Sequence, residues 1–250
     1  MGSCGSRLQA ATVADYDRLA QPTSTLSPVS DCYQSRFLYG LSVSEAKAVL
    51  GAASRRRFLA SSVVINQDDS ANRLFLLVRG RARYFFITPE GQRIILFWLT
   101  PGDIFGGATL LLQPSCYLVN TEMVRDGVVL VWDRATIHDF LTRYPRLMEN
   151  ALSIAFDYFI WYRATHVALT CHGAKQRLAQ LLVNLALSLG QKVAGGVELD
   201  VTNEELANAA NVTTFTASRL LSEWQRNGVL TKSRGKIVLR RAERLLLRSL

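Results

Sequence analysis

The sequence predicts an α+β fold in two domains, with a strand-rich domain first, one long helix next and a helical domain last. Three observations lead to this prediction. Short apolar runs separated by turn residues fill 57–132, an unbroken helical period follows Pro145, and residues 202–239 have the order helix, turn, helix, hairpin. A chain of 250 residues is long enough to bury two hydrophobic cores.

Residues 1–30 are predicted to form a mobile arm, because they are rich in Ser, Thr, Ala and Pro and show no sustained period. Regular structure is expected to begin near Cys32. One or two short helices should follow, capped by Ser42 or Ser44. We assign residues 31–144 to one domain, whose remaining elements are strands.

Five runs of β-type residues follow these helices. The runs are Ser62–Ile65, Leu74–Val78, Ala82–Phe86, Arg93–Phe97 and Gly127–Trp132. Arg79–Gly80 and Pro89–Gly91 are predicted to join neighbouring strands, and Pro101–Asp103 to break the chain before Ile104. Several short strands at this spacing are typical of a barrel or sandwich.

Helical periodicity assigns residues 145–170 to one long helix. One face has residues at heptad spacing, namely Leu147, Ile154, Trp161 and Ala168. Between them on the same face lie Ala151, Tyr158 and Thr165. The other faces carry Met148, Leu152, Phe156 and Phe159. This apolar surface is too large for one contact, which favours a helix that packs on its own strand domain and on a second subunit. A single buried core helix is the alternative.

Two helices joined by a tight turn are predicted within residues 202–223. Thr202 and Glu205 have the spacing of a capping box at the start of the first helix. Asn211 tolerates the left-handed backbone that the turn requires, and Thr213 can cap the second helix. The apolar stripe of that helix is expected at Val212, Ala217, Leu220, Leu221 and Trp224. Its outward positions are Thr214, Phe215, Ser218 and Arg219.

A β-hairpin follows, with strands at Gly228–Leu230 and Ile237–Leu239 and a turn at Ser233–Lys236. The whole pattern is that of a winged helix-turn-helix, and we assign residues 171–250 to this domain, with a hinge at Thr170–Gly173. Basic residues on or beside the turn, where DNA phosphates would neutralise them, are Lys232, Arg234 and Lys236.

Positive charge is concentrated in this last domain. The chain has a net charge of +9, and residues 170–250 hold 12 of its 29 Lys and Arg but 6 of its 20 Asp and Glu. Double-stranded DNA is therefore the expected partner. Arg219 can bond guanine O6 and N7 together, although an outward arginine that is only solvated is the alternative. The expected DNA contacts are Thr202, Thr213, Thr214, Phe215, Ser218, Arg219, Lys232, Arg234 and Lys236.

The four cysteines are scattered along the chain without a CxxC pair, which argues against a disulfide framework or a zinc site. Burial as a small hydrophobe is the expectation for Cys116 and Cys171, and a redox role is the alternative. The sequence has no apolar run of ~18 residues and no signal-peptide pattern at its start. We expect a cytoplasmic protein without membrane contact.

Three segments in a fixed order resemble the CRP/FNR superfamily of bacterial transcription regulators, over roughly residues 35–245. They are Leu76–Ala82, Pro101–Gly106 and Gln176–Leu182, ahead of the helix-turn-helix. The resemblance implies an eight-stranded, cyclic-nucleotide-binding-like β-roll (a double-stranded jelly roll), a dimerisation helix and a winged helix-turn-helix. It further implies a homodimer on a two-fold-symmetric DNA site, a small-molecule effector in or near the β-roll, and RNA polymerase as a partner.

Departures from the family pattern argue against its known cofactors. Members that bind cyclic nucleotides have a glutamate where Gly107 stands, and an arginine that Ser115–Thr121 lacks, so cyclic AMP is not expected. An iron–sulfur cluster is not expected, because Cys4 and Cys32 are too far apart for the family's cysteine motif. Haem is not expected either, since no spacing pairs the three histidines, His138, His166 and His172.

The second helix of the helix-turn-helix also departs from the family. Members commonly have glutamate one helical turn before the arginine, where this sequence has Thr214 and Phe215. Arg219 and the adjacent Ser218 match the family, so the resemblance implies guanine readout by Arg219. It does not imply the cytosine contact that the glutamate makes in other members. Phe215 is expected to touch a thymine methyl, so the DNA half-site should differ there.

An effector pocket is expected between the β-roll and the long helix, although aromatics at helical spacing are commonly core residues. Its candidate residues are Gly106, Gly107, Tyr117, Tyr158, Trp161 and Tyr162. The expected function is DNA-binding regulation. The alternative is a ligand or redox sensor that acts through protein contacts. An enzyme is not expected, because the strand segments have no paired carboxylates, nucleophile–His pair or phosphate-cradling loop.

Overall fold

The computed structural model describes residues 35–113, 115–233, 235–242 and 245. Two compact units divide these residues, one ending at Thr165 and the other starting at His166, so the division falls within the long helix. The predicted arm at 1–30, the cysteines Cys4 and Cys32, and the wing residue Arg234 lie outside the described residues.

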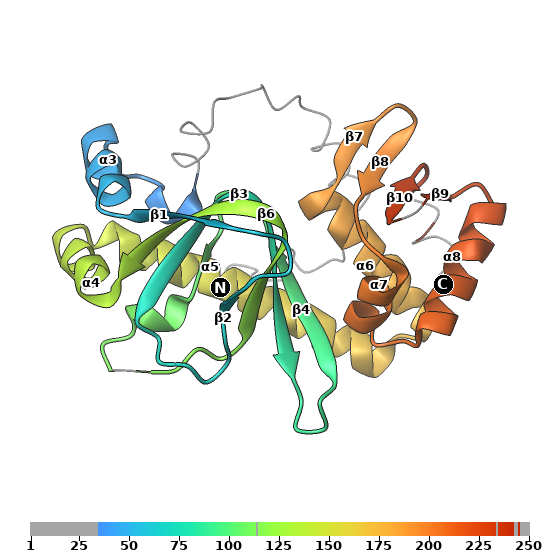
Figure 1. Ribbon diagram of the computed structural model, residues 1–250. Coiled ribbons are helices and arrows are strands. Elements are labelled where there is room, and N and C mark those ends of the chain that lie inside the picture. Colours follow the sequence, from blue (N-terminus) through green and yellow to red (C-terminus); the bar gives the residue numbers. More distant parts are fainter. Residues whose placement is uncertain (1–34, 114, 234, 243–244, 246–250) are drawn as a thin grey trace, which may run out of the picture. The chain divides into compact units, whose positions relative to one another are not determined.

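The first unit is a β-roll with helices packed on it (Figure 1). Its antiparallel sheet has the order β1-β6-β3-β4, with β2 also paired to β6 and β5 to β3. In chain order the elements are η1 (Arg36–Leu38), α3 (Val43–Gly51), β1 (Ser54–Phe58), β2 (Val63–Ile65), β3 (Arg73–Ile87), β4 (Arg93–Leu99), β5 (Ile104–Phe105), η2 (Gly107–Leu110), β6 (Asn120–Asp133), α4 (Arg134–Arg143) and α5 (Arg146–Cys171).

Strand β3 is continuous, and the predicted turn at Arg79–Gly80 was wrong. Gly80 has φ +100° inside the strand, where the β3–β6 register shifts. A Cβ atom at this position would lie 2.7 Å from the backbone oxygen of Asp126 and 2.8 Å from Cα of Gly127. Gly80 therefore forms a bulge where β6 passes closely. Because the strand runs through it, β1 to β6 are six strands where the resemblance implied eight.

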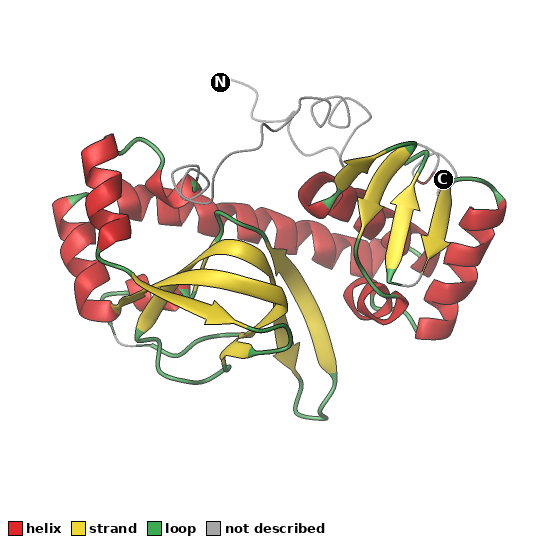
Figure 2. Ribbon diagram, turned by 45° about the horizontal axis from the view of Figure 1, so that its top comes forward, coloured by secondary structure: helices red, strands yellow, loops and turns green. Residues whose placement is uncertain are grey.

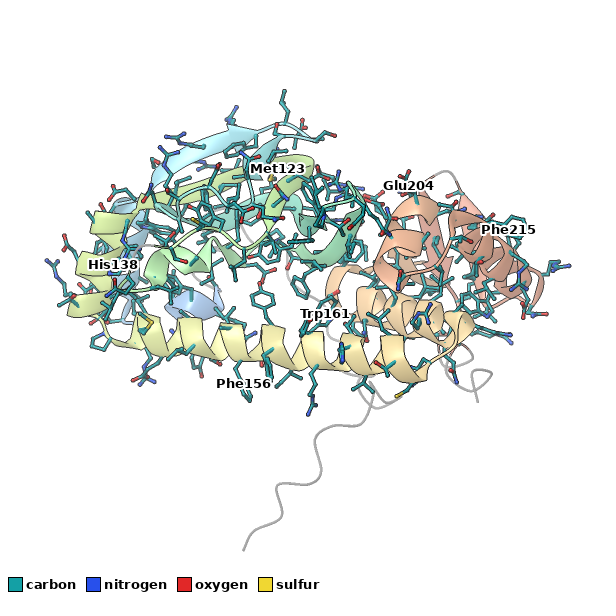
Figure 3. All side chains as sticks on the ribbon, turned by 90° about the horizontal axis from the view of Figure 1, so that it is seen from below. Met123, His138, Phe156, Trp161, Glu204 and Phe215 are labelled. Carbon is teal, nitrogen blue, oxygen red and sulfur yellow. The ribbon has the colours of Figure 1, made fainter. Side chains whose placement is uncertain are left out.

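Two large apolar clusters, and a small one of Val78 and Val128, hold the described part of this unit together. One lies inside the roll and includes Phe75, Leu99 and Met123 (Figure 3). The other joins the roll to the helices through Trp132, whose indole Nε1–H donates to the Val49 carbonyl at 2.7 Å. Helix α4 packs in this second cluster and, like β1, was not predicted from the sequence.

The second unit combines three helices with a four-stranded antiparallel sheet of order β7-β8-β10-β9 (Figure 2). Strands β9 and β10 confirm the predicted wing hairpin, but β9 begins at Leu230, where the predicted strand ended, and Ser233 and Lys236 belong to the strands and not to the turn. The β7–β8 hairpin was not predicted. Within the described residues, we find no helix with the length and apolar character that a membrane span requires. The elements are α6 (Ala174–Leu189), β7 (Gln191–Val193), β8 (Gly196–Leu199), α7 (Asn203–Ala210), α8 (Thr214–Arg226), β9 (Leu230–Ser233) and β10 (Lys236–Leu239).

Candidate functional site

Side-chain caps define the start of both helices of the helix-turn-helix. Thr202 Oγ1 accepts the Glu205 N–H at 3.1 Å, and the Glu205 carboxylate accepts the Thr202 N–H at 2.7 Å, which confirms the capping box. Asn211 has the left-handed φ of 50° that the turn requires. Thr213 Oγ1 accepts the Thr216 N–H at 3.1 Å, which confirms the second cap. The α7–α8 geometry is therefore set locally.

Helix α8 presents one polar and aromatic face to solvent. Ala217, Leu220, Leu221 and Trp224 are buried, as predicted, while Val212 is only half-buried. On the opposite face Thr214, Phe215 and Arg219 are exposed and Ser218 is half-buried. The Phe215 side chain is 77 % exposed and points away from the unit (Figure 3). The predicted base-reading residues thus share one accessible face.

Glu223 lies one turn after Arg219 on α8, but its carboxylate forms its ion pair with another residue. The Glu223 carboxylate instead accepts from Lys175 Nζ at 2.8 Å, and this bond lowers the pKa of Glu223 below its ordinary value. Lys175 lies on α6, so the ion pair also ties α8 to α6. The guanidinium of Arg219 consequently projects from α8 without this carboxylate as its hydrogen-bond partner.

Arg177 on α6 holds the turn of the helix-turn-helix, a role that we did not predict. Its guanidinium donates to the backbone oxygens of Ala210 at 2.9 Å, Asn211 at 2.8 Å and His172 at 2.9 Å. The first two oxygens lie at the end of α7 and in the turn, where helix carbonyls lack intrahelical partners. Spacing along the sequence could not reveal this contact, because it joins residues more than 30 positions apart.

Replacing Arg177 by methionine is expected to destabilise α7 and α8 by about 2 kcal/mol, because three carbonyl oxygens would lose a charged donor. Hydrogen exchange measured by mass spectrometry should then be about 30-fold faster in peptides from these helices. Arg163→Met, at an exposed position of α5, is the matched control and should change nothing there. Unchanged protection in Arg177→Met would show that the turn is held by other contacts.

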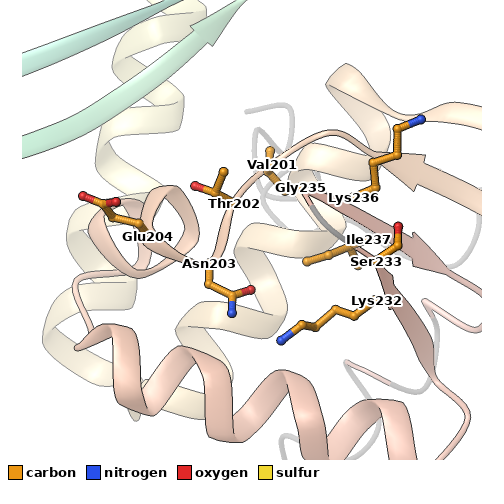
Figure 4. Close-up of a pocket in the computed structure, with 9 residues that line it drawn as sticks. All are labelled: Val201, Thr202, Asn203, Glu204, Lys232, Ser233, Gly235, Lys236 and Ile237. Atoms are coloured by element: carbon orange, nitrogen blue, oxygen red, sulfur yellow. The ribbon is translucent and has the colours of Figure 1, made fainter.

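The wing and the start of α7 enclose a hollow of about 510 Å³ (Figure 4). Its lining includes three of the predicted DNA contacts: Thr202, Lys232 and Lys236. Lys236 Nζ also forms an ion pair with Glu198 on β8 at 2.7 Å, so its charge is partly offset. Lys232 is half-buried on β9.

A larger pocket of about 1050 Å³ lies within the first unit, between the β-roll and α5. None of the described residues that line it is charged. All six residues proposed from the sequence are among them: Gly106, Gly107, Tyr117, Tyr158, Trp161 and Tyr162. A Cβ atom at Gly107 would meet no atom within 4 Å, so the missing glutamate leaves open space.

The pocket aromatics also pack on the β-roll, as expected of core residues, and their role in binding an effector stays a prediction. The rings of Tyr158 and Trp161 meet Phe97 edge to face, at centroid distances of 5.0 and 5.3 Å. Tyr117 is anchored by its hydroxyl, which donates to the Arg73 carbonyl at 2.7 Å. Figure 3 shows Trp161 on the side of α5 that faces the roll, with Phe156 on the opposite side.

An exposed apolar stripe runs along α5, and two of its residues, Leu152 and Phe159, also line the large pocket, whereas Phe156 does not. Leu152, Phe156 and Phe159 are each more than 60 % exposed and are spaced by four and three residues. The heptad face contacts the helix's own unit instead, since Leu147 and Ala151 are buried there. Met148, predicted on one of the other faces of the helix, packs against the same core.

Cysteine and histidine positions give no metal site within the described residues, where no three His, Cys, Asp or Glu side chains are grouped for one. Cys116 and Cys171 are both exposed thiols, so the expectation that they are buried was wrong. His138 was one of the three histidines considered as haem ligands. Its Nε2 atom lies 2.9 Å from the backbone oxygen of Thr109.

Comparisons with known proteins match both units. A cyclic nucleotide-binding domain model matches residues 55–144, and a Crp-like helix-turn-helix domain model matches residues 176–248. The transcriptional regulator LdrP of Thermus thermophilus is 25 % identical over 74 % of this chain and 91 % of its own length. The cyclic AMP receptor protein of the same species is 26 % identical over 83 % of this chain and 94 % of its own length.

A solved structure shares the fold. FixK2 from Bradyrhizobium japonicum superposes with a TM-score of 0.68 at 22 % identity, covering 77 % of this chain and 95 % of its own. At this identity the likeness concerns the fold alone.

Proposed function

Because the chain belongs to the CRP/FNR superfamily of DNA-binding transcription regulators, we propose that it binds a two-fold-symmetric DNA site as a homodimer under the control of an effector other than cyclic AMP. The observation that carries this proposal is the exposed face of α8, with Arg219 beside Ser218, next to a wing that bears Lys232. A major groove can accept such a helix. We further expect a cytoplasmic protein that works with RNA polymerase.

Dimerisation is supported by the stripe of Leu152, Phe156 and Phe159 on α5. Their spacing is that of a coiled-coil seam, and a second copy of α5 would cover them. A two-fold dimer presents two recognition helices to two half-sites, and so predicts a palindrome.

The expected half-site follows from the exposed face of α8. Arg219 supports guanine readout through O6 and N7, and Phe215 offers an apolar ring to a thymine methyl. Thr202 can donate its hydroxyl proton to a phosphate while its oxygen caps α7, whereas the Thr213 hydroxyl donates to Thr216 Oγ1 at 2.9 Å and would have to exchange this bond for one to a phosphate. Lys232, Arg234 and Lys236 supply charge on or beside the wing turn. Thr214 completes this face.

An effector other than cyclic AMP is supported by the chemistry of the large pocket. One relative is named a cyclic AMP receptor protein, but the pocket of this chain offers no cation for a cyclic phosphate among its described lining residues. A phosphate buried without a cationic partner would be costly.

The full-length protein should select a palindromic sequence from random DNA and bind it as a dimer in a mobility-shift assay. Because phosphate contacts release counterions, affinity should fall about 10³- to 10⁵-fold between about 50 and 200 mM salt for 6–10 contacts. Equal, weak affinity for every DNA sequence would refute the proposal. It would favour a sensor that acts through protein contacts.

A further inference from the structure

One polar atom in the large pocket has no partner. Thr121 on β6 is 0 % exposed and lines the pocket, and its hydroxyl oxygen makes no hydrogen bond with the described residues. Buried hydroxyls nearly always have a partner, since an unsatisfied one costs free energy. The Thr121 hydroxyl therefore marks a point where a bound molecule would be favoured.

Two neutral phenols lie beside this hydroxyl. Tyr84 on β3 is the direct cross-strand partner of Thr121, so both side chains occupy the same face of the sheet. The Tyr84 ring lies 6.1 Å from the ring of Tyr158 on α5. Burial raises the pKa of both tyrosines well above the ordinary value, which keeps both phenols uncharged. The pocket thus has one polar spot made of neutral hydroxyls.

Apart from Gln113, Tyr117 and Tyr162, the rest of the described wall is apolar, and this composition discriminates against a charged ligand. Leu96, Leu118, Met148 and Ile154 contribute to a lining that contains no charged residue among those described. Two charged groups outside the described lining act on Tyr158: the negative charge of Asp103 adds to the rise in its pKa, and Arg36, which forms an ion pair with Asp157, opposes this rise. A carboxylate or phosphate would lose its hydration here without gaining a cation.

We propose that this pocket binds an uncharged, largely apolar small molecule that carries a hydroxyl or carbonyl group, and that Thr121 receives this group. The hydroxyl of Thr121 can donate to a carbonyl or accept from a hydroxyl. The volume of about 1050 Å³ is at the upper end of the range of small-molecule sites. A molecule in the pocket contacts β6 through Thr121 and α5 through Tyr158 and Trp161.

The role of such a molecule as effector rests on the proposed function. Helix α5 carries the pocket residues Tyr158 and Trp161 and the exposed Phe156, which lies outside the pocket, while the exposed Phe159 belongs both to the pocket lining and to the stripe. Filling the pocket therefore changes contacts of the same helix that we propose to form the dimer. An apolar ligand can bias this helix only through a difference in affinity between its two states.

Four naphthalene derivatives test the ligand class on the full-length protein, by titration calorimetry at pH 7. They share one ring system and differ in a single group: 2-naphthol, naphthalene, 2-naphthoate and the ammonium form of 2-naphthylmethylamine. We expect 2-naphthol to bind at least about 10-fold more tightly than either charged compound, because the charged group must be desolvated. It should also bind more tightly than naphthalene.

Thr121→Val tests the anchor, since it removes the hydroxyl and keeps the shape of the side chain. The advantage of 2-naphthol over naphthalene should fall about 3- to 10-fold, while naphthalene binding stays unchanged. Thr142→Val, at an exposed position on α4 outside the pocket, is the matched control and should leave all affinities unchanged. The comparison of neutral and charged probes on the wild-type protein needs no variant and stands if Thr121→Val does not fold.

Tighter binding of 2-naphthoate, of the ammonium compound or of cyclic AMP would overturn the proposed ligand class. An unchanged naphthol advantage in folded Thr121→Val would overturn the role of Thr121. The DNA assay is separate. Binding of 2-naphthol without any change in DNA affinity would support the ligand class and remove the effector role, whereas loss of specific DNA binding alone would refute the proposed function and leave the ligand class intact.

Discussion

Phe156→Glu is expected to convert the protein to a monomer and to lower its affinity for a palindromic DNA site at least about 100-fold. Phe156 is 62 % exposed at the centre of the stripe formed with Leu152 and Phe159. Burying a phenylalanine side chain contributes about 1.5–3 kcal/mol, and a symmetric dimer loses it twice. The glutamates add the cost of placing two like charges in the seam. Sedimentation velocity and a mobility-shift assay measure the two effects.

Leu59→Glu is the matched control for this variant. Leu59 is a similarly exposed apolar residue on the connection between β1 and β2, outside α5. The same change of an apolar side chain to glutamate there should leave a dimer with full DNA affinity. A Phe156→Glu protein that sediments as a dimer would show that the subunits associate through another surface.

Helix caps and periodicity were predictable because they depend on residues close in sequence. The capping box of Thr202 and Glu205, the left-handed Asn211 and the Thr213 cap each involve a span of four residues or fewer. The length of α5 followed from an unbroken apolar period. For the same reason the order of the predicted elements and the approximate position of the wing followed from the sequence, whereas β1, α4 and the β7–β8 hairpin did not.

Contacts between distant residues explain what could not be predicted. In the sequence Gly80 resembles a turn residue, and only the structure shows that β6 passes close to it. Arg177 resembles any exposed helix arginine in the sequence, and only the structure shows its contact with the turn at Asn211. Thr121 is likewise ordinary in the sequence. Its significance depends on burial without a hydrogen-bond partner among the described residues, which only the packed β-roll reveals.

Six residues that line the pocket could be proposed from the sequence, but the absence of charge from its described lining could not. Aromatic residues such as Tyr158 and Trp161 are equally compatible with a core and with a binding site. In the structure one edge of each ring meets Phe97 while the residues also line a cavity. The absence of charge from the described lining depends on which strand residues point inward.

Arg219→Ala is expected to lower affinity for the selected palindrome by about 1–3 kcal/mol per half-site, which is about 5- to 150-fold for each arginine. The reason is that alanine cannot replace a bidentate pair with guanine O6 and N7. Affinity for unrelated DNA should change little, because phosphate contacts supply most of that binding. Selection from random DNA with the variant should therefore return sites in which the guanine is no longer preferred.

Arg226→Ala separates charge from readout, because this arginine is also exposed on α8 but lies in its last turn. It should weaken binding to all sequences about equally and leave the guanine preference intact. Arg219→Lys keeps the charge but loses the planar fork, so it should behave like alanine in sequence preference and like arginine in salt dependence. If Arg219→Ala and Arg226→Ala have the same effect on every DNA sequence, Arg219 contacts phosphate and the base at that position is read by another residue, for which Phe215 is the exposed neighbour on α8.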